Sequence, residues 1–283
     1  MNEPYIQVGT LDSLNHYLDA LKNGTFSNRK RRSEIVSVVF LTWNRDNHLL
    51  SVIESFRNFA NKVEPHVKIE YVSVDNGSTN KSIFKILNKF NWDVKIRNDK
   101  NYGIRHALDQ AFSRSHGEYI LCLEDDWLTL ATKPFLGPSI RIMDEYRDIG
   151  GVRLKENLQL AVERKIENGE IRLFPDNARM ERYNLRWRGK YRYKGWFDIR
   201  NTKANDEFYT WTGKDKTGKG QIFANGGFLM RGKAYDKVGP FSRLGSEFNY
   251  GRQFQQQYNV AILLGEERLK HLGEQRAKGL WYE

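Results

Sequence analysis

The sequence predicts an α/β protein built on a mostly parallel, doubly wound sheet that is flanked by helices. Apolar runs of strand length occupy residues 35–41, 69–74 and 118–123, and the first of them is rich in β-branched residues. Segments with a helical spacing of apolar residues separate these runs, and the order strand, helix, strand implies right-handed parallel crossovers. A chain of 283 residues is long enough to bury this sheet in one large domain.

The first half of the chain alternates between predicted strands and helices. The run at 35–41 is too short for a helix and too apolar for an edge strand, so we expect it to be the first core strand. Apolar residues from Leu49 to Phe59 recur at helical spacing and predict a helix over 46–61. The next predicted elements are a strand at 69–74, a helix at 82–90, a short strand at 93–97, a helix at 103–116 and a strand at 118–123.

The alternation of strands and helices ends after Arg153. Gly, Asn, Arg and aromatic residues dominate as far as about residue 221, which predicts loops and short hairpins over the ligand end of the sheet. Regular elements resume at 222–231, followed by helices near Ala234 and at 248–258 and by a strand at 260–264. The predicted organisation is an N-terminal helical and basic extension at 1–33, two halves of one domain at 34–153 and 154–275, and a tail at 276–283.

The composition narrows the choice of partners and compartments. A net charge of +11 favours an anionic partner, such as nucleic acid, a membrane surface or a phosphorylated small molecule. The basic run at 29–32 is interpreted as a solvated surface, with attraction to a membrane or to nucleic acid as the minor alternative. Cys122 is the only cysteine, which predicts a reducing compartment. Because no membrane span and no signal segment are recognisable, we expect a soluble cytoplasmic protein, with peripheral membrane contact as an option.

Three adjacent carboxylates, Glu124, Asp125 and Asp126, directly follow the apolar strand at 118–123. Such acids repel one another unless a divalent cation or a polyhydroxylated ligand takes them up. A solvated acidic turn is the simpler alternative, but ligands of open α/β sheets gather beyond the carboxyl ends of central strands, which is where the triplet is expected. The sequence therefore favours a metal-assisted site.

A series of motifs along the chain resembles the inverting nucleotide-sugar glycosyltransferases of the GT-A fold, above all glycosyltransferase family 2. The motifs are FLTWNR at 40–45, VDNGST at 74–79, NYGIRHA at 101–107, EDD at 124–126, ANGG at 224–227, VGPF at 238–241, Glu247, and HLG at 271–273. Each motif is weak alone, but together they occur in the order found in the family. The resemblance implies a metal-dependent, inverting transfer of a sugar from a nucleotide diphosphate sugar, with UDP favoured, to a hydroxyl of a glycan or glycoconjugate.

The resemblance also assigns roles to the acidic triplet. Asp126 would bind the cation, Glu124 would contact ribose, and Asp125 would contact a sugar hydroxyl. His271 resembles a late histidine that completes the metal site in related enzymes, although a lone histidine is more often structural. Mn²⁺ or Mg²⁺ suits such an oxygen-rich site, in which the diphosphate supplies further ligands.

Several polar residues and glycines are expected around the donor. Asp75 resembles the family's acid that accepts the imide N–H of uracil, and Asp-Asn-Gly-Ser is also good turn chemistry. Gly226 and Gly227 would let the backbone approach a sugar closely. The remaining donor candidates, for which helix capping or surface polarity is the alternative, are Thr42, Asn44 and Arg45 beside the nucleotide and Arg105 near the diphosphate.

Inversion needs a carboxylate base on the acceptor side, and Glu247 is the candidate. Phe248 follows it where the family usually has a second acid, so this sequence offers a single carboxylate there. Asp236 and Glu266 are the alternatives, and stabilisation of a helix N-terminus is the structural explanation for Glu247. The aromatic-rich segment provides two acceptor-binding candidates, Trp196 and Trp211, because sugar rings pack on flat aromatic faces.

Other classes of function remain open at this point. A nucleotidyltransferase that makes nucleotide sugars shares the layout and the metal, but the Gly-rich loop expected after its first strand is absent from 42–45. A basic nucleic-acid-binding protein without catalysis would explain the charge but not the acids at strand ends. A non-catalytic sugar-binding relative is the fourth possibility, because the base position is atypical.

Overall fold

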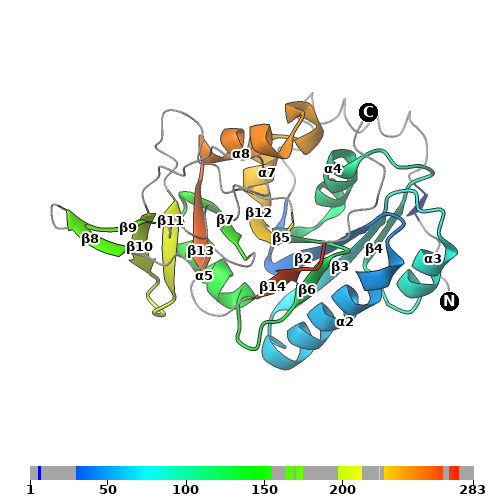
Figure 1. The fold of residues 1–283 in the computed structure, drawn as a ribbon, viewed down its shortest axis with the longest axis horizontal. Coiled ribbons are helices and arrows are strands. Elements are labelled where there is room, and N and C mark those ends of the chain that lie inside the picture. Colours follow the sequence, from blue (N-terminus) through cyan, green and yellow to red (C-terminus); the bar gives the residue numbers. More distant parts are fainter. Residues whose placement is uncertain are drawn as a thin grey trace.

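The computed structural model describes residues 30–154, 197–211, 223, 226–263 and 268–273, together with short strands at 6–7, 163–167 and 170–174. In these residues one mixed ten-stranded sheet forms the centre of the fold (Figure 1). Its strands, in spatial order, are β1 (Ile6–Gln7), β4 (Val94–Arg97), β3 (Lys68–Asp75), β2 (Arg32–Thr42), β5 (Gly117–Glu124), β12 (Phe228–Arg231), β7 (Ile149–Arg153), β13 (Asn259–Leu263), β11 (Glu207–Trp211) and β10 (Phe197–Asn201). Neighbours from β1 to β5 are parallel, and β12 is antiparallel to β5 and β7. The predicted α/β class with a mostly parallel, helix-flanked sheet is confirmed.

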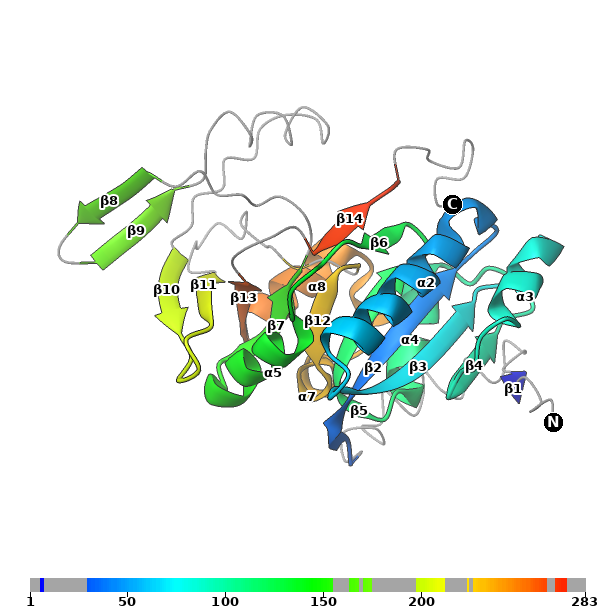
Figure 2. The ribbon, with the colours of Figure 1, turned by 90° about the horizontal axis from the view of Figure 1, so that it is seen from below.

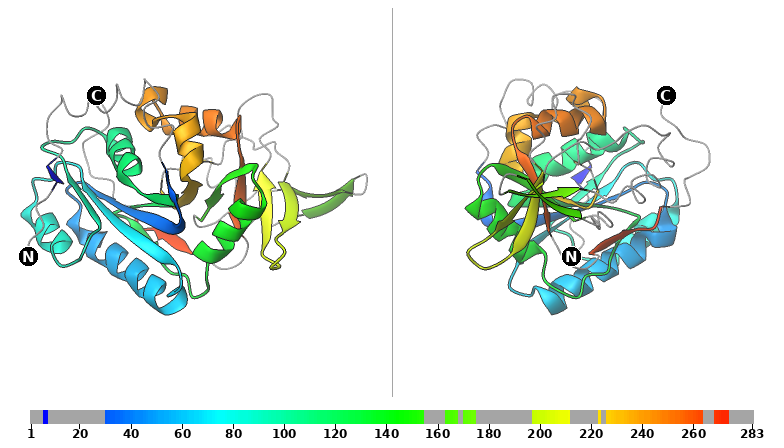
Figure 3. Two further views of the ribbon diagram at one scale, coloured as in Figure 1. Left: turned by 180° about the vertical axis from the view of Figure 1, so that it is seen from behind. Right: turned by 60° about the vertical axis from the view of Figure 1, so that its left-hand side comes forward.

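Helices cover both faces of this sheet because successive side chains of its central strands point to opposite sides. In β2, Val38 and Phe40 join one buried cluster, whereas Val39 and Leu41 join the other. The first cluster includes residues of α2 (Asp46–Val63), α3 (Lys81–Leu87) and α5 (Leu136–Glu145). The second includes residues of α4 (Ile104–Arg114), α7 (Gly232–Val238), the 3-10 helix η1 (Phe241–Leu244) and α8 (Glu247–Gln255). Figure 3 shows these two layers on either side of the strands. None of the helices described is long and apolar enough to cross a membrane.

The predicted short hairpins form, but the two within the described residues lie at the lateral edge of the large sheet that ends in β10, and not over its ligand end as the composition predicted. Strands β10 and β11 pair as a hairpin, and β8 (Glu163–Glu167) and β9 (Glu170–Phe174) form a second one that projects outward (Figure 2). A further two-stranded sheet joins β6 (Trp127–Thr129) to β14 (Leu269–His271). Strands from both predicted halves share the large sheet. The helix expected in the N-terminal extension lies outside the described residues, and the domain boundaries stay a prediction.

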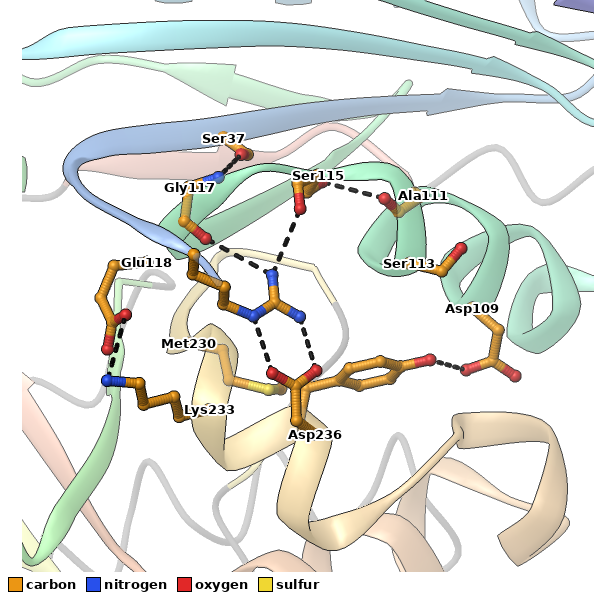
Figure 4. Close-up of polar contacts among 12 residues, drawn as sticks. Ser37, Asp109, Ala111, Ser113, Ser115, Gly117, Glu118, Met230, Lys233 and Asp236 are labelled. Carbon is orange, nitrogen blue, oxygen red and sulfur yellow. Dashed lines mark hydrogen bonds and ion pairs between the residues drawn. The ribbon is translucent and has the colours of Figure 1, made fainter. Parts of the chain in front are cut away.

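One arginine of the basic run is not on a solvated surface, which corrects the expectation for that run. The side chain of Arg31 is 0% exposed, and it donates from Nε and Nη2 to the carboxylate of Asp236 on α7 at 2.8 and 2.7 Å. Its Nη1 lies 3.4 Å from the carbonyl oxygens of Ser115 and Gly117 (Figure 4). Arg31 therefore joins the start of β2 to α7 from inside the fold. The same pairing engages Asp236, one of the alternative bases, in a structural contact.

This buried ion pair predicts a large difference between two neighbouring arginines. Arg31→Ala leaves the Asp236 carboxylate without its partner, so the free energy of unfolding should fall by about 3–5 kcal/mol. Arg32→Ala is the matched control, because that side chain is 62% exposed and pairs with Glu34 on the surface, so its cost should stay below about 1 kcal/mol. Urea unfolding measures both values. Equal losses in the two variants would contradict the structural role of Arg31.

Candidate functional site

The predicted site residues gather where the carboxyl ends of β2, β3 and β5 meet. Thr42 pairs in register with Asp75 on β3, and Leu41 pairs with Glu124 on β5. Parallel pairing of these strands thus places the three motifs that follow them on one edge of the sheet. The edge is the expected ligand end of an open α/β sheet.

Asp125 is buried at this edge and is held by groups from the loop after β2. Its Oδ2 accepts hydrogen bonds from Thr42 Oγ1 at 2.9 Å and from the Trp43 amide at 3.3 Å. Its Oδ1 lies 3.1 Å from Nη1 of Arg45. Burial raises the pKa of Asp125 to about 6; the charge of Asp126 acts in the same direction, while Arg45 and Thr42 oppose it. Asp125 therefore orders the loop after β2, a role that the sequence did not indicate.

Asp126 is equally buried and has one carboxylate oxygen engaged and one open. Its Oδ2 accepts a hydrogen bond from Arg45 and lies 3.2 Å from Nε2 of His271. Burial would raise the pKa of Asp126, but His271 and Arg45 outweigh it and the pKa is lowered. Its Oδ1 is buried and, within the described residues, has no hydrogen-bond partner. Asp126 thus stays ionised beside an unsatisfied acceptor atom.

His271 reaches this acid through the small sheet of β6 and β14. Its backbone pairs with Trp127, and the two rings stack with centroids 4.6 Å apart. The Leu272 amide donates to the carbonyl oxygen of Asp126 at 2.7 Å, which fixes the turn after β14. A Cβ on Gly273 would lie 2.7 Å from both Asp126 Oδ2 and the His271 ring. The structure brings together the predicted pair of acid and histidine, and it adds Trp127 and Gly273 as supports to which the sequence analysis gave no role.

Arg45 lies between Asp125 and Asp126 and contacts both. It precedes the first turn of α2, and its Nη1 alone bridges Asp125 and Asp126. Burial disfavours its charged form, yet both carboxylates raise its pKa above the ordinary value. Arg45 therefore offsets the charge of two acids of the triplet, and its contact with a nucleotide stays a prediction.

Asp75 offers a second unsatisfied oxygen at the same edge. Its residue is 1% exposed, and its Oδ1 accepts the Ser78 amide at 2.9 Å. Its Oδ2 is buried, has no hydrogen-bond partner among the described residues, and lies 3.8 Å from Nε of Arg97. Burial raises the pKa of Asp75, while the hydrogen bonds from Ser78 and the charge of Arg97 lower it. The two predicted roles of Asp75, turn former and acceptor for a ligand, would therefore use different oxygens of one carboxylate.

Asn44 joins the loops after β2 and β3. Its φ of 53° is in the left-handed region, which Asn tolerates better than most side chains. Its amide donates to Ser78 Oγ at 2.9 Å, and its Oδ1 accepts the amides of Thr79 and Asn80 at 2.8 and 3.0 Å. Asn44 therefore has a structural role, and its expected contact with a nucleotide stays a prediction.

A network of three asparagines then continues along the sheet edge. Asn76 donates to Asn101 Oδ1 at 2.7 Å and accepts from Asn98 Nδ2 at 2.8 Å. Asn101 Oδ1 also accepts the Gly103 amide at 2.7 Å, at the start of α4. Sequence reasoning missed this network, although Asn76 and Asn101 belong to recognised motifs.

The other donor candidates have more varied positions. Gly226 borders the triplet, because a Cβ there would lie 2.7 Å from Glu124 Oε1. Gly227 has a φ of 65° and donates its amide to the carbonyl of Cys122 at 3.0 Å. Arg105 is directed elsewhere, since its guanidinium donates to the carbonyl oxygen of Gly245. The predicted contact of Arg105 with the diphosphate stays a prediction.

The acceptor side is described only in part. Glu247 is half-buried in the first turn of α8, whose N-cap Ser246 accepts the Asn249 amide at 3.1 Å. Trp196 and the alternative base Glu266 lie outside the described residues. Trp211 belongs to β11, but its side chain is outside the described part. These candidates stay predictions.

Comparisons with known proteins agree with this geometry. The model of the family "Glycosyl transferase family 2" matches residues 37–204, which is more than half of the chain. The chain belongs to this family, and its fold is the GT-A fold. The match leaves the nucleotidyltransferase and nucleic-acid-binding alternatives without support. No curated protein matches the chain in sequence.

Solved structures with the same fold include residues 1–349 of TarS from S. aureus, at 14% identity and a TM-score of 0.52, covering 83% of this chain and 59% of that one. The same part of TarS in complex with UDP-GlcNAc aligns with a TM-score of 0.50 at 14% identity, over 86% of this chain and 61% of that one. The mannosyltransferase PcManGT from Pyrobaculum calidifontis, in complex with GDP-Man and Mn²⁺, aligns with a TM-score of 0.51 at 14% identity, over 93% and 65%. The chain therefore spans less than two thirds of each of these structures.

Substitutions of Asn44 can separate the contribution of its positive φ from that of its side-chain hydrogen bonds. Asn44→Asp keeps an acceptor oxygen and tolerance of positive φ, so its unfolding free energy should stay within about 0.5 kcal/mol of the wild type. Asn44→Gly keeps only the backbone freedom and should lose about 1 kcal/mol, and Asn44→Ala loses both and should lose about 2 kcal/mol. Urea unfolding ranks the three variants. An alanine variant as stable as the aspartate variant would refute the role of Asn44.

Proposed function

We propose that this protein is a metal-dependent, inverting glycosyltransferase that moves a sugar from a nucleotide diphosphate sugar, with UDP favoured, to a hydroxyl of a glycan or glycoconjugate. One observation carries the proposal. Two buried carboxylates, Asp75 and Asp126, each keep an unpartnered oxygen at the same sheet edge within the described residues. Buried acceptors without partners are costly, and a nucleotide and a cation are ligands that would satisfy them.

Asp75 supports the choice of a nucleotide that carries an N–H beside a carbonyl. Its open Oδ2 is suited to accept the imide N–H of uracil, while Oδ1 remains bound to the Ser78 amide. The TarS structure in complex with UDP-GlcNAc and the PcManGT structure with GDP-Man have the same fold, which supports a nucleotide sugar as the donor class. Thr42 pairs with Asp75 across the sheet, and Asn44 accepts the Thr79 amide in the loop that follows Asp75. Glu124, beside Gly226, is proposed to contact the ribose.

The residues at Asp126 fit a divalent cation. Within the described part of the chain, no three His, Cys, Asp or Glu side chains already form a metal site. Asp126 with its open Oδ1, and His271 beside it, would instead supply two ligands, and the diphosphate would supply others. The absence of a side chain at Gly273 leaves room beside both residues. Mn²⁺ or Mg²⁺ bound there would neutralise charge that builds on the leaving diphosphate.

Glu247 is the proposed general base. Inversion requires the acceptor hydroxyl to attack the anomeric carbon opposite the leaving diphosphate while a carboxylate takes its proton. The carboxylate of Glu247 is half-buried at the N-terminus of α8. Asp236 is a weaker choice, because Arg31 engages both of its oxygens. Trp196 and Trp211 remain the proposed acceptor-binding aromatics.

Donor hydrolysis in the absence of an acceptor tests this proposal. The purified protein is incubated with Mn²⁺ and a panel of UDP-, GDP- and dTDP-sugars, and release of nucleoside diphosphate is followed. One donor should be hydrolysed slowly, and both EDTA and Asp126→Ala should reduce the rate roughly a hundredfold or more. Asp206→Ala is the matched control, since that acid pairs with Arg141 and not with the triplet, and it should keep the wild-type rate. No turnover and no thermal stabilisation by any nucleotide sugar would overturn the proposal.

The role of Glu247 is tested with water as the acceptor. Glu247→Gln keeps the size of the side chain but removes the base, so the rate constant of donor hydrolysis should fall by roughly 10²-fold or more. Binding of UDP, measured by calorimetry, should stay within about twofold, because the proposed nucleotide site lies at the carboxyl ends of β2, β3 and β5 and not on α8. A rate within a few-fold of the wild type would show that another residue is the base. Parallel losses of rate and melting temperature would indicate that Glu247 has a purely structural role.

A further inference from the structure

Arg45 contacts both buried aspartates of the acidic triplet. A single nitrogen of its guanidinium contacts both Asp125, at 3.1 Å, and Asp126. The carboxylate side chains are each 9% exposed, whereas that of Arg45 is 32% exposed. The acids are thus fixed inside the site, and the arginine is the partner with access to solvent.

Arg45 and a divalent cation would compete for the negative charge of the Asp126 carboxylate. Asp126 already shares its Oδ2 between Arg45 and His271, and its Oδ1 is the open atom. A cation bound by this carboxylate would add two positive charges beside a guanidinium whose own charge the acids stabilise. Like charges at such separations repel strongly in a partly buried site. The contact between Arg45 and Asp126 therefore has to weaken when the cation binds.

We propose that Arg45 is an exchangeable counter-ion of the acidic triplet. Without ligands, Arg45 neutralises Asp125 and Asp126. When the cation and the nucleotide bind together, Arg45 leaves Asp126, and the diphosphate becomes its new anionic partner. This inference rests on the proposed function. It also gives Arg45 a regulatory role, because the arginine keeps the affinity for the cation low until the nucleotide arrives.

The arrangement has a thermodynamic consequence. If the arginine must be displaced, then cation binding to the empty protein is weakened by the competition, and the nucleotide relieves it by offering the guanidinium another anion. Cation and nucleotide should then bind with positive coupling, and the coupling is reciprocal. Removal of the guanidinium should strengthen cation binding in the absence of nucleotide and reduce the coupling.

Titration of Mn²⁺ into the protein without donor tests this inference. Free Mn²⁺ is followed by electron paramagnetic resonance, and the wild type is compared with Arg45→Ala, Arg45→Lys and Arg32→Ala. Arg45→Ala should bind Mn²⁺ roughly tenfold or more tightly than the wild type. Arg45→Lys keeps the charge and should stay near the wild type, as should Arg32→Ala, whose side chain lies on the surface at the other end of β2.

The same titration with saturating UDP measures the coupling. A titration of Mn²⁺ into UDP alone is subtracted. UDP should tighten Mn²⁺ binding in the wild type by a larger factor than in Arg45→Ala, and Asp126→Ala should abolish the protein-bound signal in both backgrounds. Circular dichroism spectra show whether each variant is folded, and Arg45→Gln replaces the alanine variant if that one is not.

The outcomes separate this inference from the proposed function. Equal or weaker Mn²⁺ binding by the folded Arg45→Ala variant overturns the counter-ion role, even if donor hydrolysis still depends on Mn²⁺ and Asp126. Tight Mn²⁺ binding by the wild type without UDP overturns it as well. Absence of Mn²⁺ binding in every variant, with and without UDP, overturns both the inference and the metal-dependent mechanism.

Discussion

The burial of Asp125 and Asp126 at the end of β5 is the constraint on which the ligand end of this fold depends. Two adjacent carboxylates inside a protein repel each other and lose hydration. Thr42 and the Trp43 amide bind one of them, His271 contacts the other, and Arg45 bridges both. The protein thus maintains a negative site that folding alone does not require, which is the physical reason to assign it to a ligand.

Other parts of the fold position the groups that offset this charge. The parallel pairing of β2 with β5 brings the loop after β2 to the acids, and the antiparallel pair of β6 and β14 delivers His271. Asn44, Asn76 and Asn101 then link the loops after β2, β3 and β4 by side-chain hydrogen bonds. The same edge contains Asp75 with its open oxygen. A nucleotide and a cation would therefore meet a largely preformed edge, in which the arginine is the main group that has to move.

The sequence predicted the parallel core and the position of the triplet, because apolar runs that end in polar residues report both burial and strand direction. The pairing of Asp126 with His271 could be expected only through family resemblance, since the two residues are far apart along the chain. Three features of the structure could not be predicted from the sequence. The bridging position of Arg45 depends on one side-chain conformation, the burial of Arg31 depends on Asp236 of a distant helix, and the asparagine network depends on loop geometry. Patterns of residue type do not encode such contacts.

The most direct test of this account is a crystal structure of the protein with UDP and Mn²⁺, with the cation located by its anomalous scattering. We expect Mn²⁺ bound by the Asp126 carboxylate, His271 and the diphosphate, uracil on the Asp75 carboxylate, and the Arg45 guanidinium moved from Asp126 to the diphosphate. A cation held elsewhere, with Arg45 still bridging Asp125 and Asp126, would contradict the account.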